Sequence, residues 1–288
     1  MPLSPNLTCR RRRWHAPPSV TGAVDTDRRD NRVVRFHRVQ VVRKMPHPGR
    51  GFSQGLLVEG SSVWESVGNY GESALRRYEL GAGSVAARAE LEPEFFGEGI
   101  CRVADRIWQL TWRERIALSW DAETLEPREQ IRYNREGWGM CAVGQESVDG
   151  AAPLPDVITS DGTSELVRRD PVTLEPREVL QVRCQGQRVR GLNDLTWAGG
   201  LVWANVAGTD CLAGIDLEVS EVTDVVDAGA AAERVWRDPQ AIMNGIAAVG
   251  APGEFLLTGK GWRSIRQARL VPDRDRGHVK RLLAGWSR

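Results

Sequence analysis

The sequence predicts an all-β protein of the five-bladed β-propeller class. Three observations predict it: short apolar runs of strand length fill the chain, an acidic turn recurs at the spacing of propeller blades, and a glycine-rich turn occurs five times. At 288 residues the chain is long enough to bury a full core as a single all-β domain.

The strand pattern begins at Val33, where glycine and polar turns interrupt the apolar runs about every ten residues. Long stretches with the period of an amphipathic helix are missing, although residues 228–241 are compatible with a short helix. We therefore expect a propeller domain over residues 33–271, a disordered basic extension over residues 1–32 and an Arg-rich tail over residues 272–288.

The first repeat pairs an apolar residue with an acid before a turn. Two copies continue into the same hexapeptide, Thr-Leu-Glu-Pro-Arg-Glu, at residues 124–129 and 173–178. The acids recur about every 40 to 50 residues, which is the length of a four-stranded blade. In these turns an Asp side chain is expected to accept hydrogen bonds from backbone N–H groups.

The second repeat places one distinctive side chain in a glycine-rich turn directly before an apolar strand. Its five copies carry Gln54, Glu98, Trp138, Asn193 and Asn244. The innermost strand of a blade begins beside the central axis, so these five residues are predicted to form a ring at one end of it. The strand at residues 34–42 is predicted to complete the last blade, and residues 144–154 to form a surface insertion.

Composition argues against several classes of function. The formal net charge of +1 gives no electrostatic reason to expect a nucleic acid or an anionic membrane as partner. No segment approaches the roughly 18 apolar residues of a membrane span. The arginines at positions 10–13 are not followed by the apolar run of a secretory signal, so the sequence favours a cytoplasmic protein.

Cysteine and histidine usage predicts neither a metal site nor a cofactor. The five cysteines are odd in number and lack CxxC spacing, and the four histidines are scattered. We therefore expect no disulfide framework, no zinc site and no His-based triad.

Glu98 is the only acid among the five ring residues. Its flanking glycines and the apolar Phe95, Phe96 and Ile100 predict partial burial, which would raise the pKa of its carboxyl group toward the range of general acid–base catalysis. The alternative is a solvated Glu98 in a simple turn. A glycoside hydrolase would need a second carboxyl group, which the ring does not offer.

Aromatic and amide side chains surround the predicted axial end. Trp112, Trp138, Trp203 and Trp262 are candidates for an aromatic wall around a small substrate, and the alternative is core filling between blades. Asn193, Asn244 and Gln54 either bind substrate or supply turn geometry. Lys260 is one of only three lysines and lies within the apolar run at residues 255–262.

At these residues the sequence resembles the plant and bacterial type of glutaminyl-peptide cyclotransferase. The resemblance covers about residues 34–270 in family order. The matching segments are 52–56 (FSQGL), 70–76 (YGESALR), 96–100 (FGEGI), 109–112 (QLTW), 136–139 (EGWG), 160–162 (SDG), 192–195 (LNDL), 203–206 (WANV), 209–211 (TDC), 244–246 (NGI) and 258–262 (TGKGW).

The resemblance implies a five-bladed propeller that converts the N-terminal glutamine of peptides to pyroglutamate without a catalytic metal. It implies Glu98 as the catalytic carboxylate, which takes a proton from the attacking amine and returns it to the departing nitrogen. Asn193 or Gln54 would bind the carboxamide or the developing oxyanion, and Lys260 would either pair with Glu98 or polarise the carbonyl. Trp112, Trp138, Trp203 and Asn244 are predicted to contact the substrate, and the protein is expected to be a monomer.

Three positions depart from the family pattern. Ala207 stands where a second aromatic residue is usual, Asp194 where Glu is common, and Gly261 in place of a bulkier apolar residue. Many members of the family are exported, whereas this N-terminus shows no signal. The alternative function is therefore a propeller with weakened or lost catalysis that binds peptide N-termini or another partner.

Overall fold

The structure is a computed structural model that describes residues 33–49, 51–144, 154–233, 241–275 and 286, all within one compact unit, Val33–Arg288. Every regular element in these residues is a β-strand, which confirms the all-β prediction. Residues 228–233 form turns, and the rest of the expected short helix up to residue 240 lies outside the described residues. The predicted N-terminal extension, nearly all of the predicted insertion and Cys9 also lie outside them.

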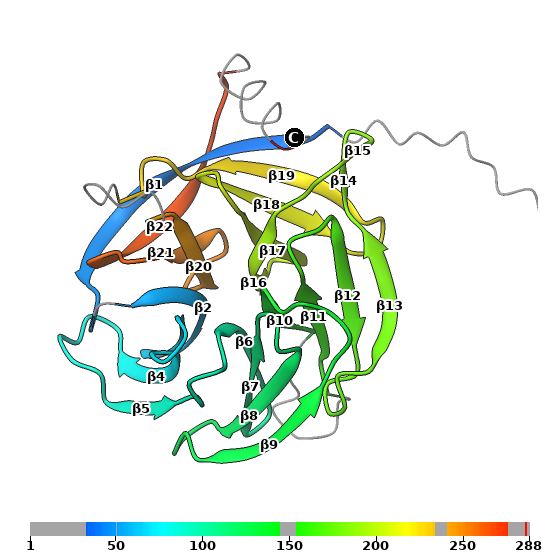
Figure 1. Cartoon of the computed structure of the whole chain (residues 1–288). Coiled ribbons are helices and arrows are strands. Elements are labelled where there is room, and N and C mark those ends of the chain that lie inside the picture. The colour runs from blue at the N-terminus through cyan, green and yellow to red at the C-terminus, as the bar shows by residue number, and fades with distance from the viewer. Residues whose placement is uncertain (1–32, 50, 145–153, 234–240, 276–285, 287–288) are drawn as a thin grey trace, which may run out of the picture. The chain divides into compact units, whose positions relative to one another are not determined.

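Three sheets have four antiparallel strands each (Figure 1). The first sheet contains β2 (Phe52–Glu59), β3 (Ser62–Gly68), β4 (Ala74–Glu79) and β5 (Ala87–Glu90). The second contains β6 (Gly97–Val103), β7 (Arg106–Thr111), β8 (Ile116–Asp121) and β9 (Pro127–Arg132). The third contains β10 (Met140–Val143), β11 (Asp156–Ser160), β12 (Glu165–Arg169) and β13 (Pro176–Gln181).

A fourth sheet has ten strands and contains two antiparallel runs. One run is β16 (Leu192–Ala198), β17 (Leu201–Val206), β18 (Cys211–Asp216) and β19 (Glu221–Asp227). The other is β20 (Met243–Ala248), β21 (Glu254–Gly259), β22 (Ser264–Pro272) and β1 (Arg35–Pro46). The short strands β14 (Arg183–Cys184) and β15 (Gln187–Arg188) attach at β19.

Strand β1 joins the beginning of the described chain to its end. It runs antiparallel to β22, from His37 opposite Pro272 to Pro46 opposite Ser264, and parallel to β19. This pairing confirms the prediction that the strand near residues 34–42 completes the last group of strands, and β1 extends further, to Pro46. The sheets therefore form a nearly closed arrangement.

The first strands of the five strand groups contact one another in a closed ring. β2 contacts β6 and β20, while β10 and β16 complete the circle. Glycines permit this approach: a Cβ atom on Gly55 would lie 2.9 Å from the Cα of Gly99, and one on Gly99 would lie 2.6 Å from the Cα of Gly139. The recurring glycine of the sequence is thus required by backbone packing around the axis.

Asp194 replaces this glycine in the fourth copy of the repeat. Its Oδ2 accepts hydrogen bonds from the backbone N–H groups of Leu56, at 3.2 Å, and Ile246, at 2.8 Å. The Asp194 side chain is fully buried. It therefore links three of the inner strands, β2, β16 and β20.

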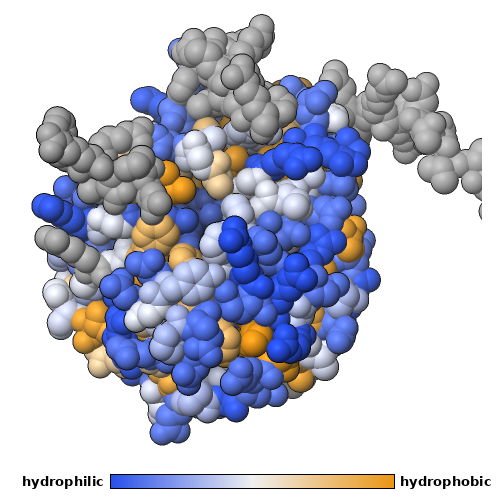
Figure 2. Space-filling model, in the orientation of Figure 1, coloured by the Kyte–Doolittle hydropathy of each residue, from blue (hydrophilic) through white to orange (hydrophobic). Residues whose placement is uncertain are grey.

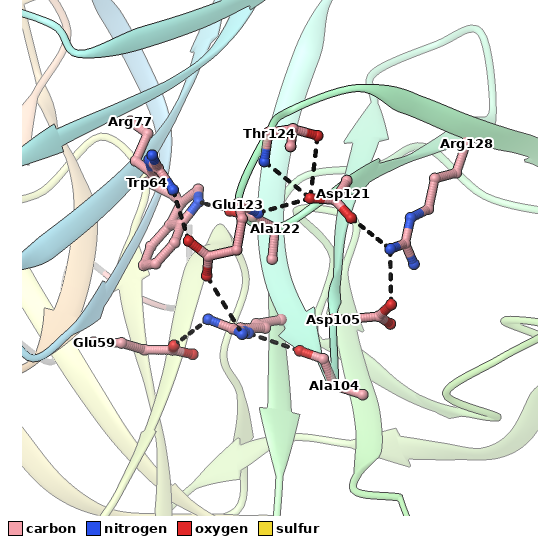
Figure 3. Close-up of polar contacts among 11 residues, drawn as sticks. Glu59, Trp64, Arg77, Ala104, Asp105, Asp121, Ala122, Glu123, Thr124 and Arg128 are labelled. Carbon is pink, nitrogen blue, oxygen red and sulfur yellow. Dashed lines mark hydrogen bonds and ion pairs between the residues drawn. The ribbon is translucent and has the colours of Figure 1, made fainter.

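Apolar side chains fill the space between neighbouring sheets, and polar contacts join their outer parts. The indole of Trp64 donates to the carbonyl of Ala122 at 2.9 Å, and Arg77 pairs with Glu123 at 2.9 Å, so both contacts join the first and second sheets (Figure 3). Arg102 returns from the second sheet to Glu59 at 2.6 Å. The face drawn in Figure 2 is mostly hydrophilic, with hydrophobic residues in small separate groups.

The acidic turns have the predicted geometry. Asp121 Oδ1 accepts from the backbone N–H of Glu123 and of Thr124 (Figure 3), and Asp170 Oδ1 does the same for Val172 and Thr173. The hexapeptide repeat therefore encodes a turn held by its preceding aspartate.

The chain beyond β22 is described only at residues 273–275 and at Trp286. The Trp286 side chain is buried in a hydrophobic cluster with Val34, Val206 and Cys211. At least this residue of the predicted tail therefore packs against the core. None of the described segments forms a helix that would be able to span a membrane.

Candidate active site

A cavity of about 450 Å³ opens where the inner strands begin. Its walls include six of the eight predicted site residues: Gln54, Glu98, Trp112, Trp138, Asn193 and Lys260. Four further residues complete the wall: Phe52, Asn69, Phe96 and Ile242. The structure therefore brings together most of the side chains that the sequence singled out.

A chain of amide hydrogen bonds orients Glu98. Gln54 Nε2 donates to Glu98 Oε1 at 3.1 Å, and Asn244 Nδ2 donates to Gln54 Oε1 at 2.7 Å. Asn244 is fully buried and does not line the cavity. The structure thus places Asn244 behind Gln54, where it fixes the direction of the Gln54 amide, and not in the predicted contact with substrate.

The Glu98 carboxyl group has a pKa well above its ordinary value. Burial is the main cause, because the charged form loses its hydration. The ammonium group of Lys260 acts in the opposite direction, while the negative charges of Asp194, Glu114 and Glu136 raise the pKa further. A buried carboxyl group of this kind is suited to accept and return a proton near neutral pH.

Lys260 lies in the turn after β21, where its backbone N–H donates to the carbonyl of Ile242 at 3.0 Å. Its Nζ lies 4.8 Å from the centroid of the Phe52 ring. Burial lowers the pKa of Lys260, and the charge of Glu98 raises it. Lys260 is thus the positive charge that acts most strongly on the candidate catalytic carboxylate.

Three aromatic rings form one wall of the cavity. The Phe96 ring centroid lies 6.3 Å from that of Phe52 and 5.6 Å from that of Trp112. The Arg113 guanidinium lies 3.8 Å from the centroid of the Trp112 ring and covers it. This wall offers apolar surface to the methylene groups of a small side chain.

Phe52, Phe96 and Ile242 line the cavity without having been predicted as site residues, although the sequence carries a signal for them. Each stands two residues before a ring residue, namely Gln54, Glu98 and Asn244. Alternate residues of an extended chain share a face, so Phe52 and Phe96 were placed to point in the same direction as Gln54 and Glu98, whereas Ile242 lines the cavity and Asn244 does not. Asn69, in the loop after β3, carried no comparable signal.

Two polar atoms of the cavity wall have no hydrogen-bond partner among the described residues. They are the indole N–H of Trp138 and Oδ1 of Asn193. The Trp138 ring is held against Gly162, where a Cβ atom would lie 2.6 Å from it. Both atoms have almost no exposed surface, so the two residues line the cavity with other parts of their side chains.

Trp203 is not brought to the cavity. It lies in β17, the second strand of its run, and its ring centroid is 5.2 Å from that of Phe255 in a hydrophobic cluster. Its indole N–H donates to the carbonyl of Ala198 at 3.1 Å. These contacts correct the prediction of a substrate-binding Trp203, because a side chain in mid-strand faces the packing between sheets.

Ala207 lies beside Gly191, in the fourth glycine-rich turn, and outside the cavity wall. Its backbone N–H donates to the carbonyl of Gly191 at 2.7 Å.

Within the described residues, no three His, Cys, Asp or Glu side chains are grouped as metal ligands would be. The four cysteines of the described segments are buried and free.

Comparison with known proteins places this geometry in a family. The glutamine cyclotransferase family model matches residues 18–270. A glutaminyl-peptide cyclotransferase of Arabidopsis thaliana is 30% identical over 241 residues, which are 82% of this chain and 72% of the relative. The crystal structure of Myxococcus xanthus glutaminyl cyclase superposes with a TM-score of 0.74 and 28% identity, covering 83% of this chain and 99% of the other. On this match, which extends over most of the described strands, the chain belongs to the glutamine cyclotransferase family.

Proposed function

We propose that this chain is a glutaminyl-peptide cyclotransferase, which converts the N-terminal glutamine of peptides or proteins to pyroglutamate and releases ammonia. Family membership supports this reaction. The observation that carries the proposal is a buried carboxyl group, Glu98, with a raised pKa in a cavity lined by aromatic and amide side chains.

We also interpret the fold as a five-bladed β-propeller. The ten-stranded sheet then consists of two blades, β16–β19 and β20–β22 with β1, joined by the parallel pairing of β1 and β19. The closed ring of five first strands supports this interpretation, because each blade of a propeller contributes one strand to the axis.

In the proposed reaction the α-amine nitrogen attacks the side-chain carboxamide carbon of the same glutamine. Glu98 accepts a proton from this nitrogen as the new N–C bond forms. It returns the proton to the amide nitrogen, whose bond to carbon breaks, and ammonia leaves. The carboxyl group ends in its starting state, so the cycle balances without another reactant.

The remaining residues orient the substrate. Asn193 or Gln54 binds the substrate carboxamide, whose oxygen develops negative charge, and the Trp138 ring forms part of the surrounding wall. Phe52, Phe96 and Trp112 pack against the methylene groups and favour the folded-back conformer. Lys260 favours the ionised form of Glu98, which is the form that accepts a proton.

The test is ammonia release from glutamine amide and from a short peptide that begins with glutamine. The expected result is ammonia release matched by an equal amount of pyroglutamyl product, in the presence or absence of a chelator. Folded protein that binds these substrates without releasing ammonia would contradict the proposal and favour the alternative of a non-catalytic binding propeller.

A further inference from the structure

A second cavity, of about 560 Å³, adjoins the active-site cavity on the side of the first sheet. We name it the flanking groove and define it by Phe52, Asn69, Glu72, Arg76, Arg88 and Gly261. Phe52 and Asn69 line both cavities, and Gly261 directly follows Lys260. The two spaces therefore meet along a shared wall.

Asn69 lies at this junction with a strained backbone. Its φ is 136°, in a region that residues other than glycine rarely adopt. The turn is held by a hydrogen bond from the Glu72 N–H to the Asn69 carbonyl at 2.9 Å, and by one from the Ser73 hydroxyl at 2.8 Å. Strain of this kind is often found where a ligand is clamped. Here it sets the Asn69 side chain, which is exposed, between the two cavities.

The groove carries charges of both signs in equal number, because Glu90 also lines it beside Glu72, Arg76 and Arg88. Arg88 pairs with Glu90 at 3.3 Å, and its Nη2 donates to the Glu72 carbonyl at 3.3 Å. Arg76 is nearly buried and donates from Nη1 to the Gly49 carbonyl at 3.3 Å. Guanidinium groups donate hydrogen bonds and carboxylates accept them, so this lining matches the alternating C=O and N–H groups of a peptide main chain. A single charged ligand would meet a groove residue of its own sign.

We propose that the flanking groove binds the two or three substrate residues that follow the N-terminal glutamine, with Arg88 donating to a substrate carbonyl and Asn69 positioning the chain where it leaves the active site. This assignment rests on the proposed function. A glutamine whose side chain faces Glu98 must send its own carbonyl, and the chain beyond it, out of the cavity. The active-site cavity and the polar flanking groove share Phe52 and Asn69, so the groove lies next to the point where that chain leaves the cavity.

The experiment compares kcat/KM for glutamine amide and for Gln-Ala-Ala amide. The wild type is expected to favour the tripeptide by about tenfold, which corresponds to about 1.4 kcal/mol, the contribution of one or two hydrogen bonds, and the gain should appear in KM. In Arg88→Ala the ratio should fall to about threefold or less. In Asn69→Ala it should also fall, with a change in turnover of glutamine amide as well.

Arg168→Ala is the matched control. Like Arg88, Arg168 is a strand arginine that pairs with a glutamate, here Glu178, and it also pairs with Asp156, but it lies in the third sheet and lines neither cavity. It should keep the wild-type ratio. Rescue of the ratio in part by Arg88→Lys would further separate a contact with substrate from a loss of folding.

Each outcome decides the assignment. A preference for the tripeptide that Arg88→Ala reduces and Arg168→Ala preserves supports the groove. Equal kcat/KM for both substrates in the wild type overturns the groove and leaves the proposed function intact. A preference that Arg88→Ala retains shows that the peptide leaves by another route, which also overturns it. No turnover of either substrate overturns the proposed function, and the groove assignment with it.

Discussion

Glu98 and Glu65 are both buried glutamates in neighbouring sheets, yet their pKa values move in opposite directions. Burial acts to raise the pKa of both. For Glu65 it is outweighed by the charge and hydrogen bond of His47, by the Ser53 hydroxyl and by Arg76, so the pKa falls. For Glu98 the neutral Gln54 amide and the charge of Lys260 do not offset burial, and the pKa rises.

His47 explains much of the difference. Its Nε2 lies 2.9 Å from Glu65 Oε1 and its Nδ1 lies 2.6 Å from the Gly49 carbonyl. Because both neighbours are acceptors, both ring nitrogens are best satisfied as donors, which describes a charged imidazolium, and the pKa of His47 is raised accordingly. Burial alone therefore does not make a carboxyl group suitable for proton transfer. A buried carboxylate held by a charged hydrogen-bond partner is structural, and one whose hydrogen bond comes from a neutral amide is available for chemistry.

Among the substitutions at or near these two glutamates, Glu98→Gln should have the largest effect, a loss of turnover. We expect kcat to fall by about 10³-fold, because the proton acceptor is lost. Thermal stability should not fall, since the substitution removes a poorly compensated buried charge and keeps the shape of the side chain. Ammonia release and a melting curve on the same sample measure both, and near-normal turnover would remove Glu98 from its role.

Glu65→Gln should lower the stability of the folded protein. We expect a loss of about 3 kcal/mol in the free energy of unfolding at pH 6, because a buried ion pair loses one member. Urea unfolding measures the loss. The conservative Ser62→Ala, at an exposed hydroxyl that contacts Glu79, is the control and should change little.

The pH dependence of this loss has a definite sign. The folded pKa of Glu65 lies below its ordinary 4.5, so its contribution is present above that pH and is lost as the pH falls through the folded value. The folded pKa of His47 lies above its ordinary 6.5, so its contribution is present below that pH and is lost as the pH rises through the folded value. The difference between wild type and variant should therefore be largest between about pH 4.5 and 6.5. A difference that does not change with pH would contradict the ion pair.

Lys260→Met removes the main charge that opposes the effect of burial on the pKa of Glu98. The pKa of Glu98 should rise further, and less of it should be ionised at neutral pH. We expect kcat/KM at pH 7 to fall by about tenfold or more, with part of the activity recovered at higher pH. A loss of activity that higher pH does not recover would show that Lys260 acts on the substrate instead.

Asp194→Asn should have the smallest effect on Glu98 and the opposite sign. Loss of a negative charge should lower the pKa of Glu98. It should also cost about 1–3 kcal/mol of stability, because the new amide NH2 group takes the place of Oδ1, which is buried without a partner, and its N–H groups stay unsatisfied. A carboxyl titration and urea unfolding measure the two effects, and a raised pKa of Glu98 would contradict this electrostatic account.

The ring of site residues was predictable because the chain repeats. The glycine after Gln54, Glu98 and Trp138 is demanded by close packing of inner strands, so its phase revealed which side chains share one end of the axis. Phe52 and Phe96, which were not predicted, occur at the same place in the repeat, two residues before Gln54 and Glu98. By contrast, Trp203 was misplaced because composition alone does not distinguish a core tryptophan from one in a cavity wall.

Other features depended on contacts that the local sequence does not encode. The pairing of His47 with Glu65 joins a loop to a separate strand, and it arises only when the first sheet forms. The position of Asn69 depends on a strained turn whose φ has no signature in the residue type. The hydrogen bonds from Asn244 to Gln54 and from Gln54 to Glu98 likewise join the last, first and second groups of strands, and the last and first groups meet only when the ring closes.

The most direct test of the central claim is the titration of Glu98 itself. Carbon NMR of protein labelled at the glutamate carboxyl carbon would follow each resonance with pH, and the Glu98 signal would be identified by its absence in Glu98→Gln. The account predicts a midpoint above the ordinary value of 4.5 for Glu98 and one below it for Glu65. A midpoint for Glu98 at or below 4.5 would contradict the claim that this carboxyl group is the proton shuttle.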